Sequence, residues 1–418
     1  MAEFIPFRGT RFNVPNEILY SYLCPPYDVI SKEKRAELLA GNPYNIVSVE
    51  LPEGGDDRYM ASGSMLQKLL SEYLLVTDDE EQFYIYEMEF LSNGRCSKLA
   101  GVIGRMKLEP FENGVILPHE NTLSAAKDDR FNLMKETFAN ISPIYSLFDD
   151  TDHTVDGIIE RITERPCISY AEYEGVTHRI YSVSGQDSAA VKAAFKDKQI
   201  YIADGHHRYE TALRFKEYCS ETGKDLQAAS YTLMACIPLQ HPGLVVLPTH
   251  RAINLRSDFD TESFLKDCST LFEQKQLSYE EAVKEMDGNF KKGITSFIYY
   301  DGRYILLTLK DDVNLQEYIP GADGAYIKLD VSVLHNLILT PLLSISENDL
   351  LRGSALIYTR DFNEAVGRVD NGSSCCAFCL NPTPVDSIAA VASAGGRMPQ
   401  KSTYFWPKLL TGLVINIM

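Results

Sequence analysis

Four side chains that bind phosphate or move protons in many proteins stand within five consecutive residues of this chain. Together with the glycine among them, they are Asp204, Gly205, His206, His207 and Arg208. The apolar run of residues 199–203 predicts a buried strand, and the apolar spacing that begins at Tyr209 predicts a helix. The first N–H groups of a helix lack partners within the helix, and the helix dipole adds partial positive charge. This predicted strand-to-helix junction therefore suits a phosphate.

A purely structural interpretation of the same residues stays open. Asp204 alone would serve as a helix N-cap and Gly205 as a turn residue, with the two histidines as satisfied surface groups. An aspartate, two histidines and an arginine in five residues form a denser cluster than capping requires, which favours a functional site. Neither interpretation names a reaction.

A second cluster lies in residues 118–130, which predict a loop followed by a helix. A histidine and a carboxylate come first, and two cations follow about two helical turns later: His119, Glu120, Lys127 and Arg130. A carboxylate beside a histidine, with cations in reach, suits acid and base chemistry on a phosphorylated substrate. Equally, Asn121 or Thr122 is a helix N-cap with a solvated charged face after it.

Further donors follow later predicted strands. His250 and Arg251 stand where residues 243–251 leave a strand, a place where open sheets carry ligand contacts. Lys401 and Ser402 offer donors to phosphate oxygens, but their loop lacks the glycine spacing of a phosphate loop. A single cation at a strand end is most often a surface charge. Together, polar groups at four element boundaries predict one polar cleft.

Strand and helix patterns are interleaved along the chain, which predicts an α/β fold, with a mixed α+β arrangement as the variant. Residues 231–239 and 243–251 are expected to join the strand before Asp204 in one central sheet. The predicted division has an N-terminal α/β region at 1–150, a core segment with the Asp204 turn at 151–253, an inserted or appended subdomain at 254–325, and a C-terminal segment that packs on the core at 326–418.

The charge balance limits the classes of partner. The chain has 418 residues, with 40 Lys and Arg against 58 Asp and Glu and a formal net charge of -18. This balance argues against nucleic acid and anionic membrane as partners. The sequence shows neither a signal peptide nor an apolar stretch long enough to span a bilayer, so we expect a cytoplasmic protein. The oligomeric state stays open.

The nine cysteines, an odd number in a long chain, predict free thiols and no disulfide framework. Cys375, Cys376 and Cys379 are close enough in sequence for a metal or redox site. Their apolar surroundings, and the lack of a second Cys/His pair at zinc-site spacing, favour buried structural cysteines.

Eight segments, in order, resemble the bacterial and archaeal family known as domain of unknown function 1015. They are CPPYDVIS at 24–31, NPYNIV at 42–47, PHENT at 118–122, DDRFNLM at 128–134, SPIY at 142–145, YIADGHHRYETAL at 201–213, LPTHR at 247–251 and MPQKSTYFWPKLLTGL at 398–413. The resemblance spans nearly the whole chain. Members of this family tend to lie beside genes for phosphoserine-forming enzymes, which points to serine metabolism by association.

The Asp-Gly-His-His-Arg element also resembles the nucleotide-handling turn of the ParB and sulfiredoxin superfamily, which includes a free-serine kinase and partition proteins that hydrolyse CTP. The resemblance implies a ParB/sulfiredoxin-like core, elaborated here by additional α/β subdomains. It also implies that Arg208 holds phosphate. Among the acidic residues that handle the substrate hydroxyl in the kinase branch, Asp204 matches the turn and Glu120 matches by position only.

We therefore expect a phosphotransferase that moves phosphate between a nucleotide, ATP or ADP with Mg²⁺, and a small hydroxyl compound, serine and phosphoserine being the favoured pair. The expected catalytic residues are Asp204, Glu120, His206 and His207. The expected substrate- and phosphate-binding residues are Arg208, Gly205, His119, Arg130, His250, Arg251, Lys401 and Ser402. The alternatives are a phosphoserine-type phosphatase, a nucleotide-binding regulator without turnover, and a metal-dependent nuclease, which the negative net charge disfavours.

Overall fold

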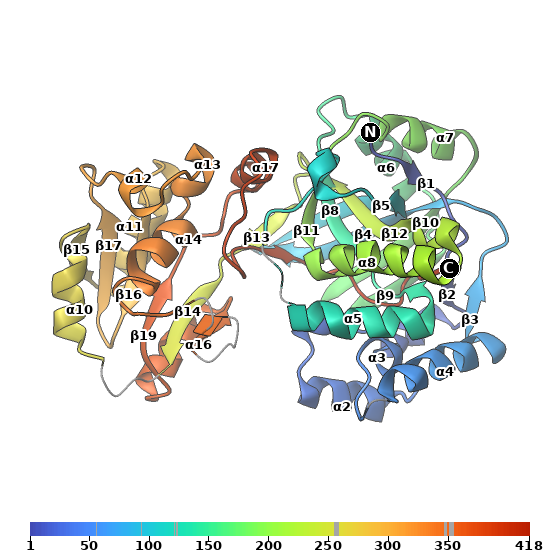
Figure 1. Ribbon diagram of the computed structural model, residues 1–418, viewed down its shortest axis with the longest axis horizontal. Helices are drawn as coiled ribbons and strands as arrows, with labels where there is room; N and C mark the ends of the chain where they lie inside the picture. The colour runs from blue at the N-terminus through green and yellow to red at the C-terminus, as the bar shows by residue number, and fades with distance from the viewer. Residues whose placement is uncertain are drawn as a thin grey trace. The chain divides into compact units, whose positions relative to one another are not determined.

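The structure, a computed structural model, describes residues 1–55, 57–92, 94–120, 122, 124–254, 259–346, 349–350 and 355–418. The described chain forms two compact units (Figure 1). Unit 1 comprises Met1–Pro118, Thr122–Val245 and Trp406–Met418, and unit 2 comprises His119–Asn121 and Val246–Phe405. The finer division into four segments stays a prediction.

A sheet of nine strands, counted over the described residues, carries unit 1. The strands are β1 (Phe4–Ile5), β4 (Phe83–Ser92), β5 (Arg95–Lys107), β6 (Ile116–Leu117), β8 (Ile144–Phe148), β9 (Ser169–Tyr173), β10 (Val176–Val183), β11 (Ile200–Asp204) and β12 (Tyr231–Pro238). Their order is β6-β11-β8-β12-β5-β4-β10-β9, and β1 also pairs with β5. β11 runs parallel to β6, and β12 runs parallel to β8, whereas the other pairs are antiparallel. The predicted mixed α/β class is confirmed.

The helices of unit 1 cover this sheet and its edges. They are α1 (Asn16–Leu19), α2 (Lys32–Gly41), α3 (Val47–Glu50), α4 (Arg58–Ser71), α5 (Ser124–Thr137), α6 (Thr154–Thr163), α7 (Gly185–Ala194), α8 (His206–Thr222) and α9 (Leu226–Ala229). α8 packs against β8 and β12, and α5 packs alongside α8 (Figure 1). Tyr209, Ala212, Phe215 and Cys219 recur at helical spacing and are buried, which fixes the face that α8 turns to the core.

The predicted strand-to-helix junction is confirmed. β11 ends at Asp204 and α8 begins at His206. Residues 200–203 are all buried, as expected for an apolar strand inside a sheet. Gly223 ends α8 in the left-handed conformation, with φ at 70°, which a glycine adopts without steric cost.

Short strand pairs complete the two units. β2 (Thr10–Phe12) pairs with β3 (Leu75–Thr77), and β13 (Val245–Leu247) pairs with β20 (Tyr404–Trp406). β7 (Ala139–Asn140) pairs with β21 (Asn416–Ile417). This last pairing, with backbone hydrogen bonds from Thr411 to Cys24 and from Ile415 to Thr10, ties the C-terminal segment into unit 1.

Unit 2 is built on a second, six-stranded sheet in the order β15-β17-β16-β19-β14-β18, as far as the described residues go. The strands are β14 (His250–Asn254), β15 (Phe272–Leu277), β16 (Ser296–Tyr300), β17 (Tyr304–Leu309), β18 (Leu356–Thr359) and β19 (Ser374–Cys379). The helical segments are α10 (Thr261–Cys268), α11 (Tyr279–Lys291), α12 (Leu315–Tyr318), α13 (Gly324–Ile327), α14 (Asp330–Val333), the π-helix η4 (Leu334–Leu339), α16 (Phe362–Asp370) and α17 (Val385–Ser393).

The expectation that residues 243–251 join the sheet of Asp204 is wrong, whereas residues 231–238 do join it as β12. The first part of the segment forms β13, and its end begins β14 in the six-stranded sheet. Pro248 stands between the two strands and has no N–H to donate, so it separates one apolar run into strands with different partners.

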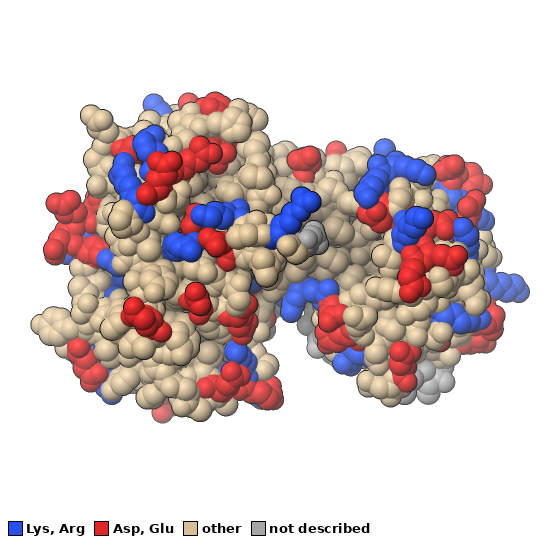
Figure 2. Space-filling model, turned by 180° about the vertical axis from the view of Figure 1, so that it is seen from behind, with Lys and Arg blue, Asp and Glu red and all other residues tan. Residues whose placement is uncertain are grey.

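The nine cysteines are thiols outside disulfides, and Cys376 and Cys379 are buried in β19. No helix in the described part of the chain is long and apolar enough to cross a bilayer. On the face drawn in Figure 2, acidic and basic side chains are interspersed over each unit.

A buried histidine links two neighbouring strands of unit 1. The side chain of His178 on β10 lies beside Tyr86 on β4, and both are at most 2% exposed. The Tyr86 hydroxyl accepts a hydrogen bond from the N–H of Leu410 at 3.0 Å, so its own proton points to Nδ1 of His178 at 2.8 Å. Burial lowers the pKa of His178 to about 3.

We predict that His178 makes unit 1 less stable in acid. Because its folded pKa lies below the ordinary value of 6.5, the unfolded chain takes up a proton that the folded chain does not bind as the pH falls. Between pH 6.5 and 4.5 this difference lowers the free energy of unfolding by about 2 kcal/mol, and the effect is absent from His178→Gln. Urea unfolding of both proteins over this range measures it, and identical pH dependence would contradict it.

Candidate functional site

Gly205 shapes the start of α8. Its φ of 96° is a left-handed conformation that side chains rarely adopt. A Cβ at this position would lie 2.9 Å from Nε of Arg208. The glycine therefore lets the guanidinium fold back over the first turn of its own helix.

The Arg208 guanidinium has three neighbours that fix its position. One terminal nitrogen donates to the carbonyl of Pro143 at 2.6 Å and to the hydroxyl of Ser142 at 3.2 Å. The other donates to Oδ2 of Asp204 at 2.8 Å. Its Nε is buried and has no hydrogen-bond partner among the described residues.

A second cation completes the pairing around Asp204. Nζ of Lys408, brought in by the C-terminal segment, lies 2.8 Å from Oδ1 of Asp204. Both cations are about nine-tenths buried, with side-chain exposures of 12% for Arg208 and 11% for Lys408. One carboxylate thus pairs with two cations at the start of α8, where the helix dipole adds partial positive charge.

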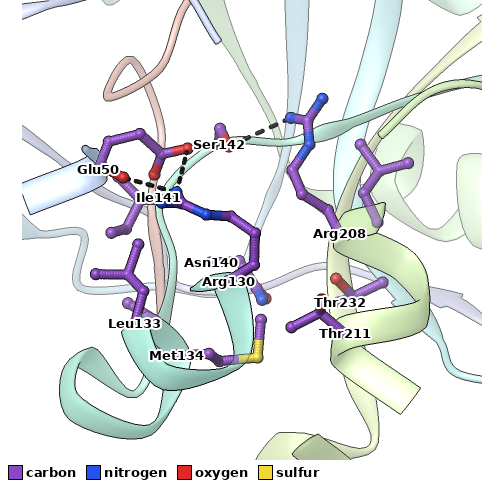
Figure 3. A pocket seen from close by; sticks show the side chains of 12 residues that line it. Glu50, Arg130, Leu133, Met134, Asn140, Ile141, Ser142, Arg208, Thr211 and Thr232 are labelled. Carbon is purple, nitrogen blue, oxygen red and sulfur yellow. Dashed lines mark hydrogen bonds and ion pairs between the residues drawn. The ribbon is translucent and has the colours of Figure 1, made fainter. Parts of the chain in front are cut away.

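A narrow cavity of about 40 Å³ opens beside Arg208, and Arg130 lies on its other side (Figure 3). A terminal nitrogen of Arg130 lies 3.7 Å from Oε1 of Glu50 and donates to the Glu50 carbonyl at 2.6 Å. The Ser142 hydroxyl links Arg208 to Glu50, because it accepts a hydrogen bond from Arg208 and donates one to Oε1 of Glu50 at 3.1 Å. Glu50 in turn pairs with Arg130. The predicted residues Arg130 and Arg208 therefore belong to one polar network.

Burial raises the pKa of the Glu50 carboxyl, although Arg130 and Arg208 act in the opposite direction. The Arg130 guanidinium also lies 4.2 Å from the ring centre of Tyr27, whose pKa is raised by burial. On its far side Arg130 pairs with Asp129 at 2.5 Å. A carboxyl group with a raised pKa next to two cations is a typical proton-transfer group.

The two histidines of the turn and the charged residue Glu210 lie on α8 itself. His206 is buried at 6% exposure and His207 is half-buried, both in the first turn of α8. Glu210 accepts from Lys127 at 2.7 Å and from the Thr122 hydroxyl at 2.8 Å. Asn121, the other predicted N-cap, lies outside the described residues.

Six predicted site residues belong to unit 2, where they form a cluster of their own. His119 is fully buried, with Nε2 3.1 Å from the Thr403 hydroxyl. Glu120 forms a β-bridge with Met398, and its Oε1 accepts from the N–H of Lys401 at 3.3 Å. The PHENT loop and the C-terminal RMPQKST loop, far apart in sequence, thus lie side by side.

Arg251 lies in the same cluster and is 3% exposed. Its guanidinium donates to the carbonyls of Thr249 and, at 3.3 Å, of Lys401, and lies 5.5 Å from the ring centre of Tyr358. Burial lowers the pKa of Arg251, and the neighbouring Tyr358 and Glu120 act against this shift.

The remaining two predicted residues are held by backbone contacts. Nδ1 of His250 accepts from the N–H of Leu380 at 3.1 Å, and burial, helped by Arg251, lowers the pKa of His250 to about 4. The Ser402 hydroxyl donates to the carbonyl of Pro399 at 2.5 Å. The structure sets the predicted site residues in two clusters, one in each unit. That both clusters line a single cleft stays a prediction.

The carboxylates do not fit a magnesium ion in this arrangement. Both oxygens of Asp204 already pair with cations, and Glu50 is engaged by Arg130 and Ser142. Within the described ranges no group of three or more His, Cys, Asp and Glu side chains is placed to hold a metal ion. We therefore derive no step through a resident metal.

The sequence prediction missed three members of the unit 1 network. Ser142 and Lys408 stand in the SPIY and MPQKSTYFWPKLLTGL segments, whose family resemblance was a usable signal. Glu50 directly follows the largely apolar segment IVSV. A charged side chain next to residues that are expected to be buried indicates a candidate functional group, because charged side chains are seldom buried without a partner.

The chain was compared with protein families and with solved structures. A family model described as "Protein of unknown function (DUF1015)" matches residues 4–332, which confirms the resemblance seen in the motifs. The comparison with curated proteins returned no match.

Among solved structures, a conserved hypothetical protein from Pyrococcus furiosus is 12% identical, with a TM-score of 0.35 over 71% of this chain and 89% of that one. A free serine kinase in complex with AMP is 12% identical, with a TM-score of 0.35 over 70% and 83%. SbnI with C-terminal truncation from Staphylococcus aureus is 9% identical, with a TM-score of 0.38 over 75% and 87%. Likeness at this level carries no argument about activity.

We predict that Gly205 is required for the shape of the junction. Gly205→Ala adds a left-handed strain and a contact with Arg208, and should lower the free energy of unfolding by about 2 kcal/mol or more. Gly223 is the matched control on the same helix, because its φ is also positive but its added Cβ would meet nothing within 4 Å. Gly223→Ala should cost about 1 kcal/mol. Equal losses in denaturant unfolding would show that the contact with Arg208 is unimportant.

Proposed function

We propose that this chain, which belongs to the DUF1015 family, is a phosphotransferase that moves phosphate between a nucleotide and a small hydroxyl compound, with serine and phosphoserine as the favoured pair. The observation that carries the proposal is the pair of largely buried cations at the start of α8, Arg208 and Lys408, which both pair with Asp204. We place this activity in the cytoplasm.

Charge and geometry support phosphate as the ligand. A helix N-terminus and a guanidinium bind phosphate oxygens through several donors at once, and the buried Nε of Arg208 has no hydrogen-bond partner among the described residues.

The roles of the network follow from its charges. In the transfer, the substrate hydroxyl oxygen attacks the terminal phosphorus of the nucleoside triphosphate. The bond from this phosphorus to the leaving nucleoside diphosphate breaks, and the hydroxyl proton passes to a carboxylate. Arg208 and Lys408 stabilise the charge that moves from one phosphate to the next. Asp204 pairs with both cations and so positions them.

Glu50 is the proton acceptor that this network supports, because its pKa is raised and Ser142 links it to Arg208. Glu120 in unit 2 stays the second candidate for this role, and His206 and His207 are proposed to orient phosphate or substrate. The nucleotide brings its own magnesium as part of the substrate.

We predict that Arg208→Ala weakens binding of ATP or ADP at least tenfold, because it removes the guanidinium that would hold the phosphate. Arg214→Ala is the control, since Arg214 lies on the same helix but is 48% exposed and pairs with Asp128. Isothermal titration with Mg²⁺ present measures both. Normal binding by folded Arg208→Ala would remove the centre of the proposal.

Turnover separates the proposed activity from its alternatives. We expect phosphorus NMR to show phosphate exchange between serine and ATP, or between phosphoserine and ADP, and to show its loss in Arg208→Ala. Free phosphate from phosphoserine without nucleotide would identify the phosphatase instead. Nucleotide binding without any turnover would identify the regulator.

We predict that Glu50→Gln lowers kcat about a hundredfold or more, while nucleotide affinity changes by less than about threefold, because it removes a proton acceptor and leaves the cations in place. Glu53→Gln is the control, since Glu53 lies three residues away and is 53% exposed. An unchanged kcat in Glu50→Gln would move the role to Glu120, which Glu120→Gln then tests.

A further inference from the structure

A cavity of about 270 Å³ lies within unit 2, apart from the residues assigned above. It is formed by the end of α11, by α13 and the start of α14, and by the loop that leads from β19 into α17. α13 contacts α17 directly in this part of the unit. The side chains that matter for its chemistry are Phe290, Lys328, Leu329, Asp330, Asn381 and Ser387.

Asp330 is a half-buried carboxylate in the wall of this cavity. Its Oδ2 accepts a hydrogen bond from Nδ2 of Asn381 at 3.2 Å, and Asn381 is itself 8% exposed. Burial raises the pKa of Asp330 to about 7, and the hydrogen bond from Asn381 acts against this shift. The cation nearest in sequence that lines the cavity, Lys328, is exposed. A carboxylate withdrawn from water normally has a cation or several donors as partners, because its desolvation is costly.

A structural role explains only part of this arrangement. Asp330 is the first residue of α14, where an acidic side chain is stabilised by the helix dipole. That role is served equally well by an exposed side chain and does not require a cavity. α14 also runs directly into the π-helix η4, a distortion that is often found at functional sites.

We propose that this cavity binds a small organic cation, with a primary ammonium or guanidinium group on Asp330 and an apolar body against Phe290 and Leu329. Asn381, which hydrogen-bonds to Asp330, is uncharged, so the ligand supplies a countercharge to the carboxylate. A metal ion fits less well, because hard cations favour several carboxylate ligands and Asp330 is the one carboxylate among the described lining residues. The volume holds a molecule of several heavy atoms, more than a single ion needs.

The test uses putrescine and agmatine as probes and 1,4-butanediol as the uncharged control, titrated into the full-length protein at pH 8. We expect both amines to bind and the diol to bind at least tenfold more weakly. Asp330→Asn should weaken amine binding at least tenfold. Asp386→Asn should leave it unchanged, because Asp386 is exposed on α17 and does not line the cavity.

The pH dependence gives a second readout. Because the bound cation favours ionised Asp330, affinity should fall about tenfold for each pH unit below 7, and binding near pH 7 should release protons to the buffer. Ser387→Phe, which fills the cavity without touching the carboxylate, should also abolish binding and keeps the test valid if Asp330→Asn unfolds. Equal binding of amine and diol, or amine binding that survives in folded Asp330→Asn or Ser387→Phe, would overturn the proposal. These outcomes do not depend on phosphate transfer.

Discussion

The pairing of one carboxylate with two cations at the start of α8 is the interaction on which unit 1 depends. Asp204 ends the strand, Arg208 folds back from the first turn of the helix, and Lys408 arrives from the C-terminal segment. Each needs the others, because two buried cations at the positive end of a helix would repel one another without the carboxylate. The end of a strand, the helix that begins directly after it and a segment distant in sequence are thus joined by charge at one point.

Backbone structure supplies the conditions for this pairing. Gly205 leaves room for the guanidinium, and the buried strand β11 leads directly to Asp204. The pairing of β21 with β7 holds the segment that carries Lys408 in place. From there Ser142 extends the network to Glu50 and Arg130. The result is a preorganised set of charges, and such a set needs little rearrangement to receive an anion.

The sequence predicted the local features of this site and missed its long-range ones. The strand, the turn and the helix around residues 200–222 follow from apolar spacing and from glycine chemistry, which are local signals. Lys408 and Ser142 reach Asp204 and Arg208 only through tertiary contacts, which no spacing within one segment encodes. The same limit explains the error at residues 243–251. Their apolar residues predict strands, but they do not determine which strands these pair with. The prediction of one cleft also depends on tertiary structure, and it stays a prediction.

The central claim is that the start of α8 holds the phosphates of a nucleotide. A crystal structure with a non-hydrolysable ATP analogue tests it most directly. The account predicts phosphate oxygens within hydrogen-bonding distance, about 3 Å, of Arg208 or Lys408 and of the first N–H groups of α8. A nucleotide bound elsewhere, with the three-residue pairing at Asp204 unchanged and no phosphate at the helix, would contradict it.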